Sequence, residues 1–172
     1  MYLRDASQVA YSASVLGNRY ENQECSAARA LELVGERWSL LILRDAMFGK
    51  YTRFSQFQQS LGVATNILAK RLEGFVADGL MAHRQPKGPG EQAEYLLTQK
   101  GLEMKPAIIA LTAWGDKWVR PGPVVYRHAA DGRPVELQLR RAGDDTPVAV
   151  SDVVVARRPV RRRAKRARRT GD

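Results

Sequence analysis

Residues 53–80 read RFSQFQQSLGVATNILAKRLEGFVADGL and contain two short helical patterns on either side of a tight corner, Leu61-Gly62-Val63. The second helix, predicted over residues 64–78, has an apolar side formed by Leu68, Leu72, Phe75 and Val76. Its opposite side carries Asn66, Lys70 and Glu73. Its first turn is made of small or polar residues that would allow another molecule to approach closely. A helix pair with this pattern buries one face of its second helix and leaves the other face free.

Further helices are predicted at residues 7–20, 26–34, 38–47 and 104–119. Gly35 separates the second from the third, and Gly49 is predicted to end the third. After the helix at 64–78, two strand-like runs flank a loop rich in glycine and proline, Pro86-Lys87-Gly88-Pro89-Gly90. This pattern predicts a β-hairpin, so the fold class is mainly α with a β-wing (α+β).

Four segments follow from these patterns. Residues 1–23 are expected to form an N-terminal dimerisation arm with an amphipathic helix, and residues 24–120 are expected to form the main domain. Residues 121–156 alternate in short strand patterns around turns and predict a small β-appendage. Residues 157–172 have no apolar pattern that could be buried, so we expect a disordered tail.

The net charge of +10 is concentrated in that tail. Residues 157–172 hold nine Lys/Arg and one acid, whereas residues 23–120 carry a net charge of only +3. A strongly basic tail favours polyanionic partners. The sequence has no long apolar run and no secretory signal pattern, and its one cysteine excludes an internal disulfide, so we expect a cytoplasmic protein that does not contact membranes.

Helices, a two-helix corner, a hairpin and a closing helix form the order of a winged helix-turn-helix. Residues 24–118 strongly resemble the HxlR-type bacterial transcriptional regulators. The matching landmarks are Cys25, LELVGERWSLLILRD (31–45), RFSQF (53–57), NILAKRLEGFVADGL (66–80), EYLLTQKG (94–101) and WG (114–115). The resemblance implies a sequence-specific DNA-binding regulator, expected to be a nucleoid-associated repressor that binds a palindromic operator as a homodimer.

In a helix-turn-helix, the free face of the second helix lies in the major groove, where base edges differ in their donors and acceptors. Thr65, Asn66 and Lys70 are therefore predicted to contact DNA, and Ala69 is small enough to permit close approach. The alternative is an ordinary solvated polar face. The resemblance favours the DNA contact.

The wing, residues 81–97, offers His83, Arg84 and Lys87 to the backbone or minor groove of DNA, unless it is an exposed loop with incidental charge. Arg53 begins the helix before the corner, where backbone N–H groups commonly meet phosphate. Arg71 points toward the apolar side of its helix, so we expect it to pair with an acid and to serve the structure, and the alternative is a contact with DNA.

Cys25 precedes a helix, and a helix N-terminus stabilises a thiolate. Some HxlR-type regulators sense oxidants or electrophiles at the matching cysteine, so Cys25 is a candidate redox sensor. Nearby Glu21 and Glu24 would oppose thiolate formation, and the alternative is an inert, buried residue. An oxidant or an unidentified small molecule is the corresponding candidate effector.

No enzyme motif is apparent, since the two histidines lie far apart in sequence and no phosphate loop, nucleophile elbow or metal cluster is present. We therefore expect no catalysis, cofactor or metal. Two other functions remain open. The tail could make the chain a nucleoid-associated or RNA-binding protein, or the β-appendage could be a ligand-binding module.

Overall fold

The computed structural model describes residues 20, 23–86, 88–90 and 92–157. The chain divides into two units, the first ending at Tyr126 and the second beginning at Arg127. Apart from Tyr20, the predicted helix at 7–20 lies outside the described residues, and so does the tail from residue 158 onward. The predictions made for those segments stay predictions.

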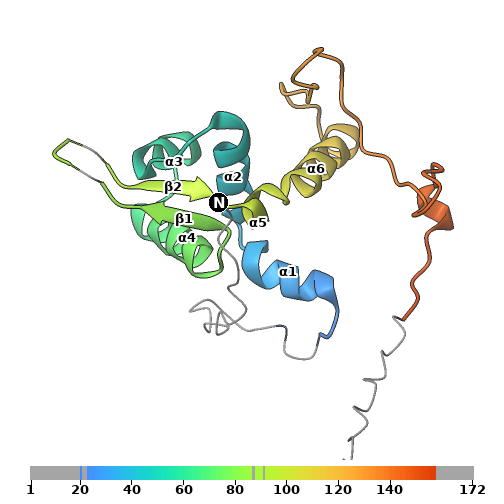
Figure 1. The fold of residues 1–172 in the computed structure, drawn as a ribbon, viewed down its shortest axis with the longest axis horizontal. Helices are drawn as coiled ribbons and strands as arrows, with labels where there is room; N and C mark the ends of the chain where they lie inside the picture. Colours follow the sequence, from blue (N-terminus) through green and yellow to red (C-terminus); the bar gives the residue numbers. More distant parts are fainter. Residues whose placement is uncertain (1–19, 21–22, 87, 91, 158–172) are drawn as a thin grey trace, which may run out of the picture. The chain divides into compact units, whose positions relative to one another are not determined.

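The described part of the first unit has the element order of a winged helix-turn-helix (Figure 1). Its elements are α1 (Ser26–Val34), α2 (Ser39–Arg44), the π-helix η1 (Asp45–Gly49), α3 (Phe54–Leu61), α4 (Thr65–Ala77), β1 (Met81–Arg84), β2 (Glu94–Leu97), α5 (Gln99–Leu102) and α6 (Lys105–Trp118). The predicted fold class is confirmed. None of the helices in the described ranges is long and apolar enough to cross a membrane.

The core lies where α2, α3 and α4 meet the hairpin. The fully buried side chains come from each of these helices and include Ile42, Leu43, Phe57, Leu68 and Leu72. Helix α4 contributes its apolar side to this core, as its sequence pattern predicts. The polar side of α4 is thereby left facing outward.

The corner between α3 and α4 depends on a glycine. Gly62 ends α3 in the left-handed conformation with φ of 60°, which glycine adopts without a steric penalty. Val63 then turns into the core, and Ala64 occupies the N-cap of α4 without a side-chain hydrogen bond. At the other end of α4, Gly79 has φ of 71° and Leu80 N donates to Phe75 O at 2.8 Å, a Schellman cap.

The helix predicted at 38–47 differs from the observed structure at its C-terminal end. It continues as the π-helix η1, and Lys50 rather than a glycine takes the left-handed conformation, with φ of 58°. Gly49 lies inside the π-helix instead of capping it, where an added Cβ would approach the Tyr51 ring to 3.1 Å. The prediction that Gly49 ends this helix was therefore wrong, because Lys50 is the capping residue.

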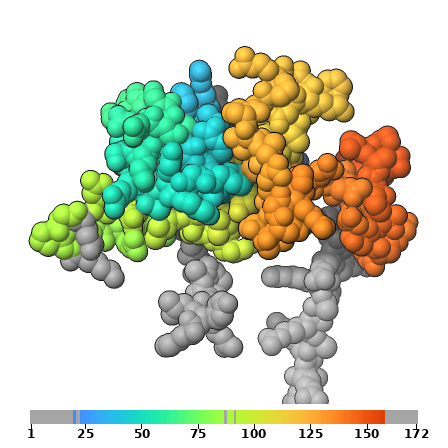
Figure 2. Space-filling view, turned by 90° about the horizontal axis from the view of Figure 1, so that it is seen from above, coloured from blue at the N-terminus to red at the C-terminus, as the bar shows by residue number. Residues whose placement is uncertain are grey.

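The wing is an antiparallel hairpin in which Met81 pairs with Leu97 and Arg84 pairs with Glu94. Figure 2 shows its tip projecting from the edge of the first unit. After β2, Thr98 caps the short helix α5, which the sequence patterns did not predict; its Oγ1 accepts from Gly101 N at 3.2 Å and donates to Gly79 O at 2.7 Å. The end of α4 and the start of α5 are thus fastened to each other.

The second unit consists mainly of two similar turns. Antiparallel bridges join Arg127 to Pro134 and Arg140 to Pro147, and each residue of the second bridge lies thirteen positions after its counterpart. In the described part of this unit these bridges are isolated, so the predicted β-appendage contains no continuous strands there. A short 3-10 helix, η2 (Val150–Asp152), follows.

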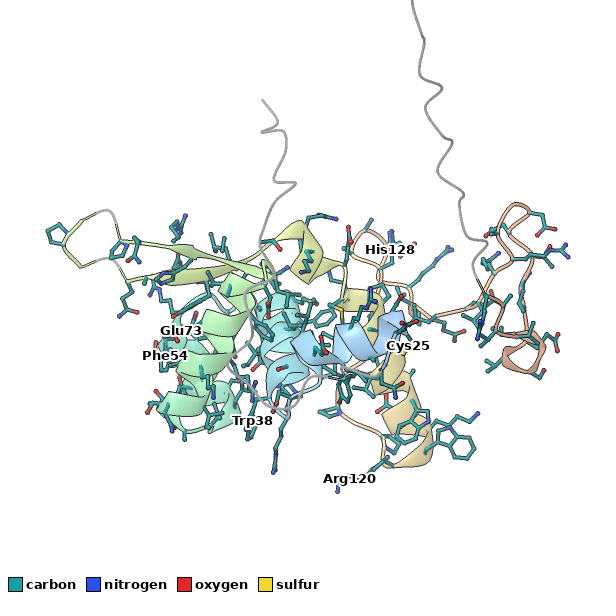
Figure 3. All side chains as sticks on the ribbon, turned by 90° about the horizontal axis from the view of Figure 1, so that it is seen from below. Cys25, Trp38, Phe54, Glu73, Arg120 and His128 are labelled. Atoms are coloured by element: carbon teal, nitrogen blue, oxygen red, sulfur yellow. The ribbon has the colours of Figure 1, made fainter. Side chains whose placement is uncertain are left out.

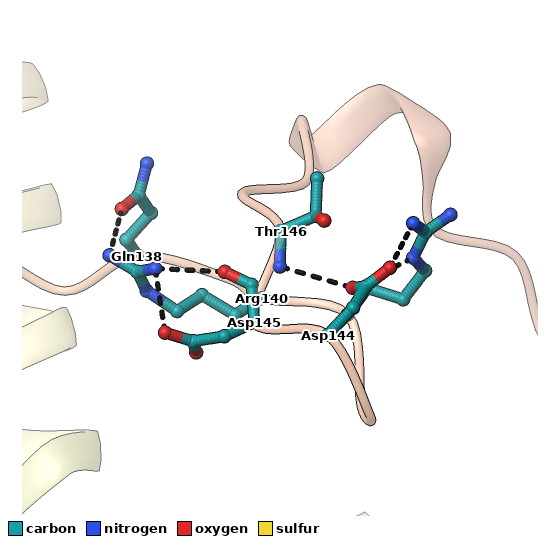
Figure 4. A network of polar contacts seen from close by, with 6 residues as sticks. Gln138, Arg140, Asp144, Asp145 and Thr146 are labelled. Atoms are coloured by element: carbon teal, nitrogen blue, oxygen red, sulfur yellow. Dashed lines mark hydrogen bonds and ion pairs between the residues drawn. The ribbon is translucent and has the colours of Figure 1, made fainter.

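The same hydrogen bonds recur in both turns. Arg127 Nη1 donates to Gly132 O at 2.9 Å, and Arg140 Nη1 donates to Asp145 O at 2.8 Å. An aspartate carboxylate in each turn accepts from the backbone N–H two residues later. Each turn is therefore closed by its own arginine and aspartate, and Figure 4 shows these contacts for the second turn.

Candidate nucleic-acid interface

The outward face of α4 carries the residues predicted to read DNA. Thr65, Asn66 and Lys70 are exposed, while Ala69 is half-buried beside them. On the opposite side, Leu68 and Leu72 have no exposed surface. Because the core fixes one side of the helix, the first two turns present their polar side chains on a rigid support.

Ile67 belongs to the same exposed part of α4, and the sequence analysis missed it. Its side chain is 37% exposed between Asn66 and Leu68. An isoleucine suggests a core position in a sequence pattern, so only its place beside Asn66 marks it. An exposed apolar side chain at this position is suited to contact with a thymine methyl group.

Glu73 lies farther along the outward side of α4 (Figure 3) and is exposed. A carboxylate there would repel phosphate. The part of α4 that is suited to DNA is therefore its N-terminal half, from Thr65 to Lys70.

Arg53 is the N-cap of α3 and its side chain is exposed. The Gln56 Oε1 atom accepts from the backbone nitrogens of Thr52 at 3.0 Å and Arg53 at 2.9 Å, which satisfies two backbone donors at this end of the helix. The Arg53 side chain itself makes no hydrogen bond among those found in the described residues. Its contact with phosphate stays a prediction.

The base of the wing is tied to the start of α3. Tyr95 N donates to Thr52 O at 2.7 Å, and Thr52 Oγ1 donates to a Glu94 carboxylate oxygen at 3.0 Å. Arg84 forms an ion pair with the same carboxylate. Arg84 therefore helps to hold the hairpin to α3, a contact that the sequence alone did not indicate.

The ion pair leaves part of the Arg84 side chain exposed, at 58%, so it can also face DNA. Lys87, the other predicted wing contact, lies outside the described residues. Along the hairpin, His83 stacks on Tyr95 with ring centroids 4.9 Å apart. Burial, and to a smaller extent the charge of Glu73, raises the pKa of Tyr95 above its ordinary value.

Arg71 takes the structural role predicted for it. Its Nη2 atom lies 2.8 Å from a Glu36 carboxylate oxygen, and its side chain is only 13% exposed. Glu36 lies in the link between α1 and α2, so this pair joins that link to α4. The prediction that Arg71 pairs with an acid is confirmed.

Cys25 is the N-cap of α1 (Figure 3), and its Sγ atom accepts from Ala28 N at 3.3 Å. The residue is exposed. The expectation of a buried cysteine, one part of the alternative, is therefore wrong, and a role in redox sensing stays a prediction.

No group of three or more His, Cys, Asp or Glu side chains suited to a metal ion occurs within the described ranges. The exposed residues that were predicted to contact DNA instead make up a candidate surface on α3 and α4, two helices that contact each other directly. Arg53 and Lys70 supply cationic groups to this surface, and Thr65 and Asn66 supply hydrogen-bonding groups. The arrangement is suited to a duplex groove and its phosphates.

Known proteins resemble this chain over the same region. The sequence profile of the HxlR-like helix-turn-helix family matches residues 33–123. The HTH-type transcriptional regulator Rv3095 of Mycobacterium tuberculosis is 40% identical over 131 residues, which cover 74% of this chain and 81% of that protein.

Two solved structures are also similar. PA1607, described as a candidate transcription factor, is 39% identical with a TM-score of 0.72, and the match covers 82% of this chain and all of that one. PA1374 of Pseudomonas aeruginosa, described in the same way, is 34% identical with a TM-score of 0.57, covering 79% of this chain and 94% of that one.

Proposed function

Since the chain belongs to the HxlR-like helix-turn-helix family and is a DNA-binding transcriptional regulator, we propose that it represses transcription by binding a palindromic operator as a homodimer. The observation that carries this proposal is the two-sided construction of α4. Its core side is fully buried, and its outward side presents Thr65, Asn66 and Lys70 without a competing partner in the described residues.

In this proposal the N-terminal half of α4 lies in the major groove. Asn66 is suited to adenine, which offers one acceptor and one donor, and Lys70 is suited to guanine or phosphate. Arg53 binds phosphate, and Arg84 and Lys87 follow the backbone or minor groove from the wing. The link between wing and α3 through Thr52 and Glu94 keeps these two contacts in a fixed relation.

The dimer is supported by an apolar surface on α6. Leu111, Trp114 and Trp118 are 52%, 57% and 66% exposed. A row of large apolar side chains along one helix is typical of an interface. A second copy of the chain would cover it and would place two recognition helices about 34 Å apart on DNA.

Trp118→Asp is expected to shift the protein toward monomer in sedimentation velocity at micromolar concentration, because it puts a charge into the interface. Leu16→Asp, in the predicted N-terminal helix, is expected to do the same. Val155→Asp is the control, since Val155 is an exposed apolar residue of the second unit and is not part of the α6 surface. A wild-type protein that sediments as a monomer even with operator DNA would contradict the dimer.

We also propose that Cys25 lets an oxidant act on the regulator, supported by its exposure and its place at a helix N-terminus. Peroxide treatment is expected to weaken operator binding by the wild type but not by Cys25→Ser. Serine also caps helices, so the variant keeps an acceptor for Ala28 N–H. Equal loss in both proteins would contradict this role.

The overall proposal is tested by selecting duplexes from random DNA with the full-length protein. An inverted repeat is expected, with half-sites about one helical turn apart. A reporter placed under that sequence should rise in expression when the regulator is removed. Recovery of no preferred sequence would contradict operator recognition, and a fall in expression would contradict repression.

A further inference from the structure

The first unit contains a cavity of about 310 Å³ whose lining residues include none from α3, α4 or the hairpin. One wall is the end of α2 and the π-helix, with Arg44, Asp45 and Phe48, and the other comprises Thr112 of α6 and the residues Pro123, Val124 and Tyr126. This volume is at the lower end of small-molecule sites, so it suits a single-ring compound.

The chain after α6 is held across this space rather than packed into it. Gly122 N donates to Asp116 Oδ1 at 2.8 Å, and the hydroxyl groups of Tyr126 and Thr112 are 3.0 Å apart. The Tyr126 ring lies 4.9 Å from the Phe48 ring, measured between centroids. These contacts at both ends of the segment keep the cavity open and give it aromatic and aliphatic walls.

A guanidinium lies at the polar end of the cavity. Arg44 Nε donates to Asp45 Oδ1 at 2.8 Å, and the Arg44 side chain is 42% exposed whereas that of Asp45 is 7% exposed. Among the described residues the guanidinium hydrogen-bonds only to Asp45, and arginine has five N–H donors. Its remaining donors can therefore bind an acceptor oxygen of a ligand.

The charges around the cavity nearly cancel. Lys105 Nζ lies 5.5 Å from the centre of the Phe48 ring and adds to the charge of Arg44, while Asp45 and Asp116 oppose them. A ligand therefore needs an acceptor oxygen and a flat ring more than it needs a negative charge.

The cavity is connected to the helix-turn-helix through Asp45. Its second carboxylate oxygen, Oδ2, accepts from Ser60 Oγ at 2.7 Å. Ser60 is in the last turn of α3, next to the Leu61-Gly62 corner that sets the direction of α4. Short π-helical turns are frequent at functional sites, and this one carries the residue that joins the two regions.

We propose that this cavity binds a small aromatic compound with a carbonyl or carboxylate oxygen, and that binding alters operator affinity through the Asp45–Ser60 hydrogen bond. The regulatory half of this inference rests on the proposed DNA-binding function, and the binding half does not. A ligand changes operator affinity only if it binds the DNA-competent arrangement with a different affinity from the alternative one.

Binding is tested on the full-length protein without DNA, by calorimetric titration with benzoate and with benzamide. Both are expected to bind with a Kd of about 1 mM or tighter, and acetate, which lacks the ring, is not. Val124→Trp fills the mouth of the cavity and should weaken binding by about tenfold or more. Val125→Trp, at an exposed neighbour that does not line it, should change the Kd by less than about twofold. Absence of binding by both aromatic probes, or equal effects of the two variants, would overturn the proposal.

Coupling is tested by measuring operator affinity with and without saturating benzoate. The wild type should change its affinity by about fivefold or more, Ser60→Ala should bind benzoate but show little change, and Ser60→Thr should restore the response. An operator affinity that benzoate leaves unaltered in the wild type would overturn the coupling. If no operator is bound at all, the proposed function fails while the calorimetric result still decides whether the cavity is a ligand site.

Discussion

Asn66 and Lys70 are exposed on the outward side of α4, and Glu73 lies on the same side one turn later. Replacing Asn66 or Lys70 with alanine is expected to lower the affinity for a selected operator by about 1–3 kcal/mol, because a good base contact is lost. The affinity for random duplexes should fall less. Fluorescence anisotropy with both kinds of duplex measures the difference.

Glu73→Ala is the control for these two variants. It removes a side chain from the same face without removing a donor, so operator affinity should stay constant or increase. Equal losses on operator and random DNA for Asn66→Ala and Lys70→Ala would assign both residues to general backbone attraction.

Asp144 gives a residue-level prediction about pH. The Arg141 guanidinium, together with the Thr146 backbone N–H, lowers the pKa of the Asp144 carboxyl to about 2. Because the folded pKa is below its ordinary value of 3.8, the ion pair stabilises its turn above about pH 4 and loses that effect as the pH falls toward 2. A carboxyl NMR titration should give a midpoint near 2.

Arg141→Gln should move that midpoint back toward 3.8, since it removes the largest cause of the shift. Arg140→Gln is the matched control, because Arg140 pairs with Asp145 instead. A midpoint near 3.8 in the unaltered protein would show that the pair does not form in solution.

Some residue roles were predictable and others were not, for a physical reason. Position around the helix was enough to indicate the pairing of Arg71, because the angle between residues on a helix is fixed. The partner of Arg84 depends on hairpin register, and its connection to Thr52 depends on contacts across more than forty residues. Neither the hairpin register nor these long-range contacts can be read from the local sequence.

Among the elements, α5 depends on a close approach by the backbone of Leu80. A Cβ on Gly101 would lie 2.2 Å from Leu80 O and 2.9 Å from Leu97 Cδ2, so one of these groups would have to move. Gly101→Ala is expected to destabilise the protein by about 1–3 kcal/mol in urea denaturation. Gly74→Ala, in the middle of α4 with open space around it, should stabilise it by about 0.5–1 kcal/mol. Similar effects of the two variants would contradict the close approach.

The sequence predicted the helices on either side of the Leu61-Gly62-Val63 corner, α3 and α4, more accurately than it predicted α5 and the π-helix. The segment predicted at 64–78 is observed as α4 at Thr65–Ala77, because its apolar side and its glycine cap are both local features. The short helix α5 has too few residues for a periodic pattern and depends on its Thr98 cap. The π-helix holds Asp45, whose carboxylate accepts a hydrogen bond from Ser60 of α3, and this contact between distant residues cannot be read from a local pattern.

At the scale of the whole molecule, the positive charge of residues 157–172 leads to a prediction about the salt dependence of DNA binding, which can be measured directly. Each phosphate neutralised contributes about −0.9 to the slope of log affinity against log salt. If four or five of the nine cations engage DNA, truncation after Ala156 should flatten that slope by about 4 units. Binding titrations at several salt concentrations would measure it.

The truncated protein should bind more weakly overall but keep its preference for the operator, because the recognition surface lies on α3 and α4. Equal slopes for the full-length and truncated proteins would show that the tail does not contact DNA. Loss of the preference itself would favour the tail-driven alternative.

The sequence and the structure divide the chain at different places. The first unit ends at Tyr126, whereas the main domain was predicted to end at residue 120. The secondary structure of the appendage was harder to predict. Its valine-rich runs suggest strands, whereas its structure shows isolated bridges. Strands need partners to satisfy their backbone groups, and the described part of this unit buries almost no side chains.

The paired turns of the second unit also determine the effective length of the tether between Tyr126 and Arg157. Eight extended residues would span about 26–29 Å, yet each bridge brings the first and last residue of an eight-residue turn to about 5 Å. The two turns together shorten the span of the extended tether by roughly 40 Å. Shortening a tether raises the local concentration of whatever is attached to it. Replacing the aspartate of either turn would open that turn and lengthen the tether. The local concentration of the basic residues that follow it would then fall around any DNA that α4 binds.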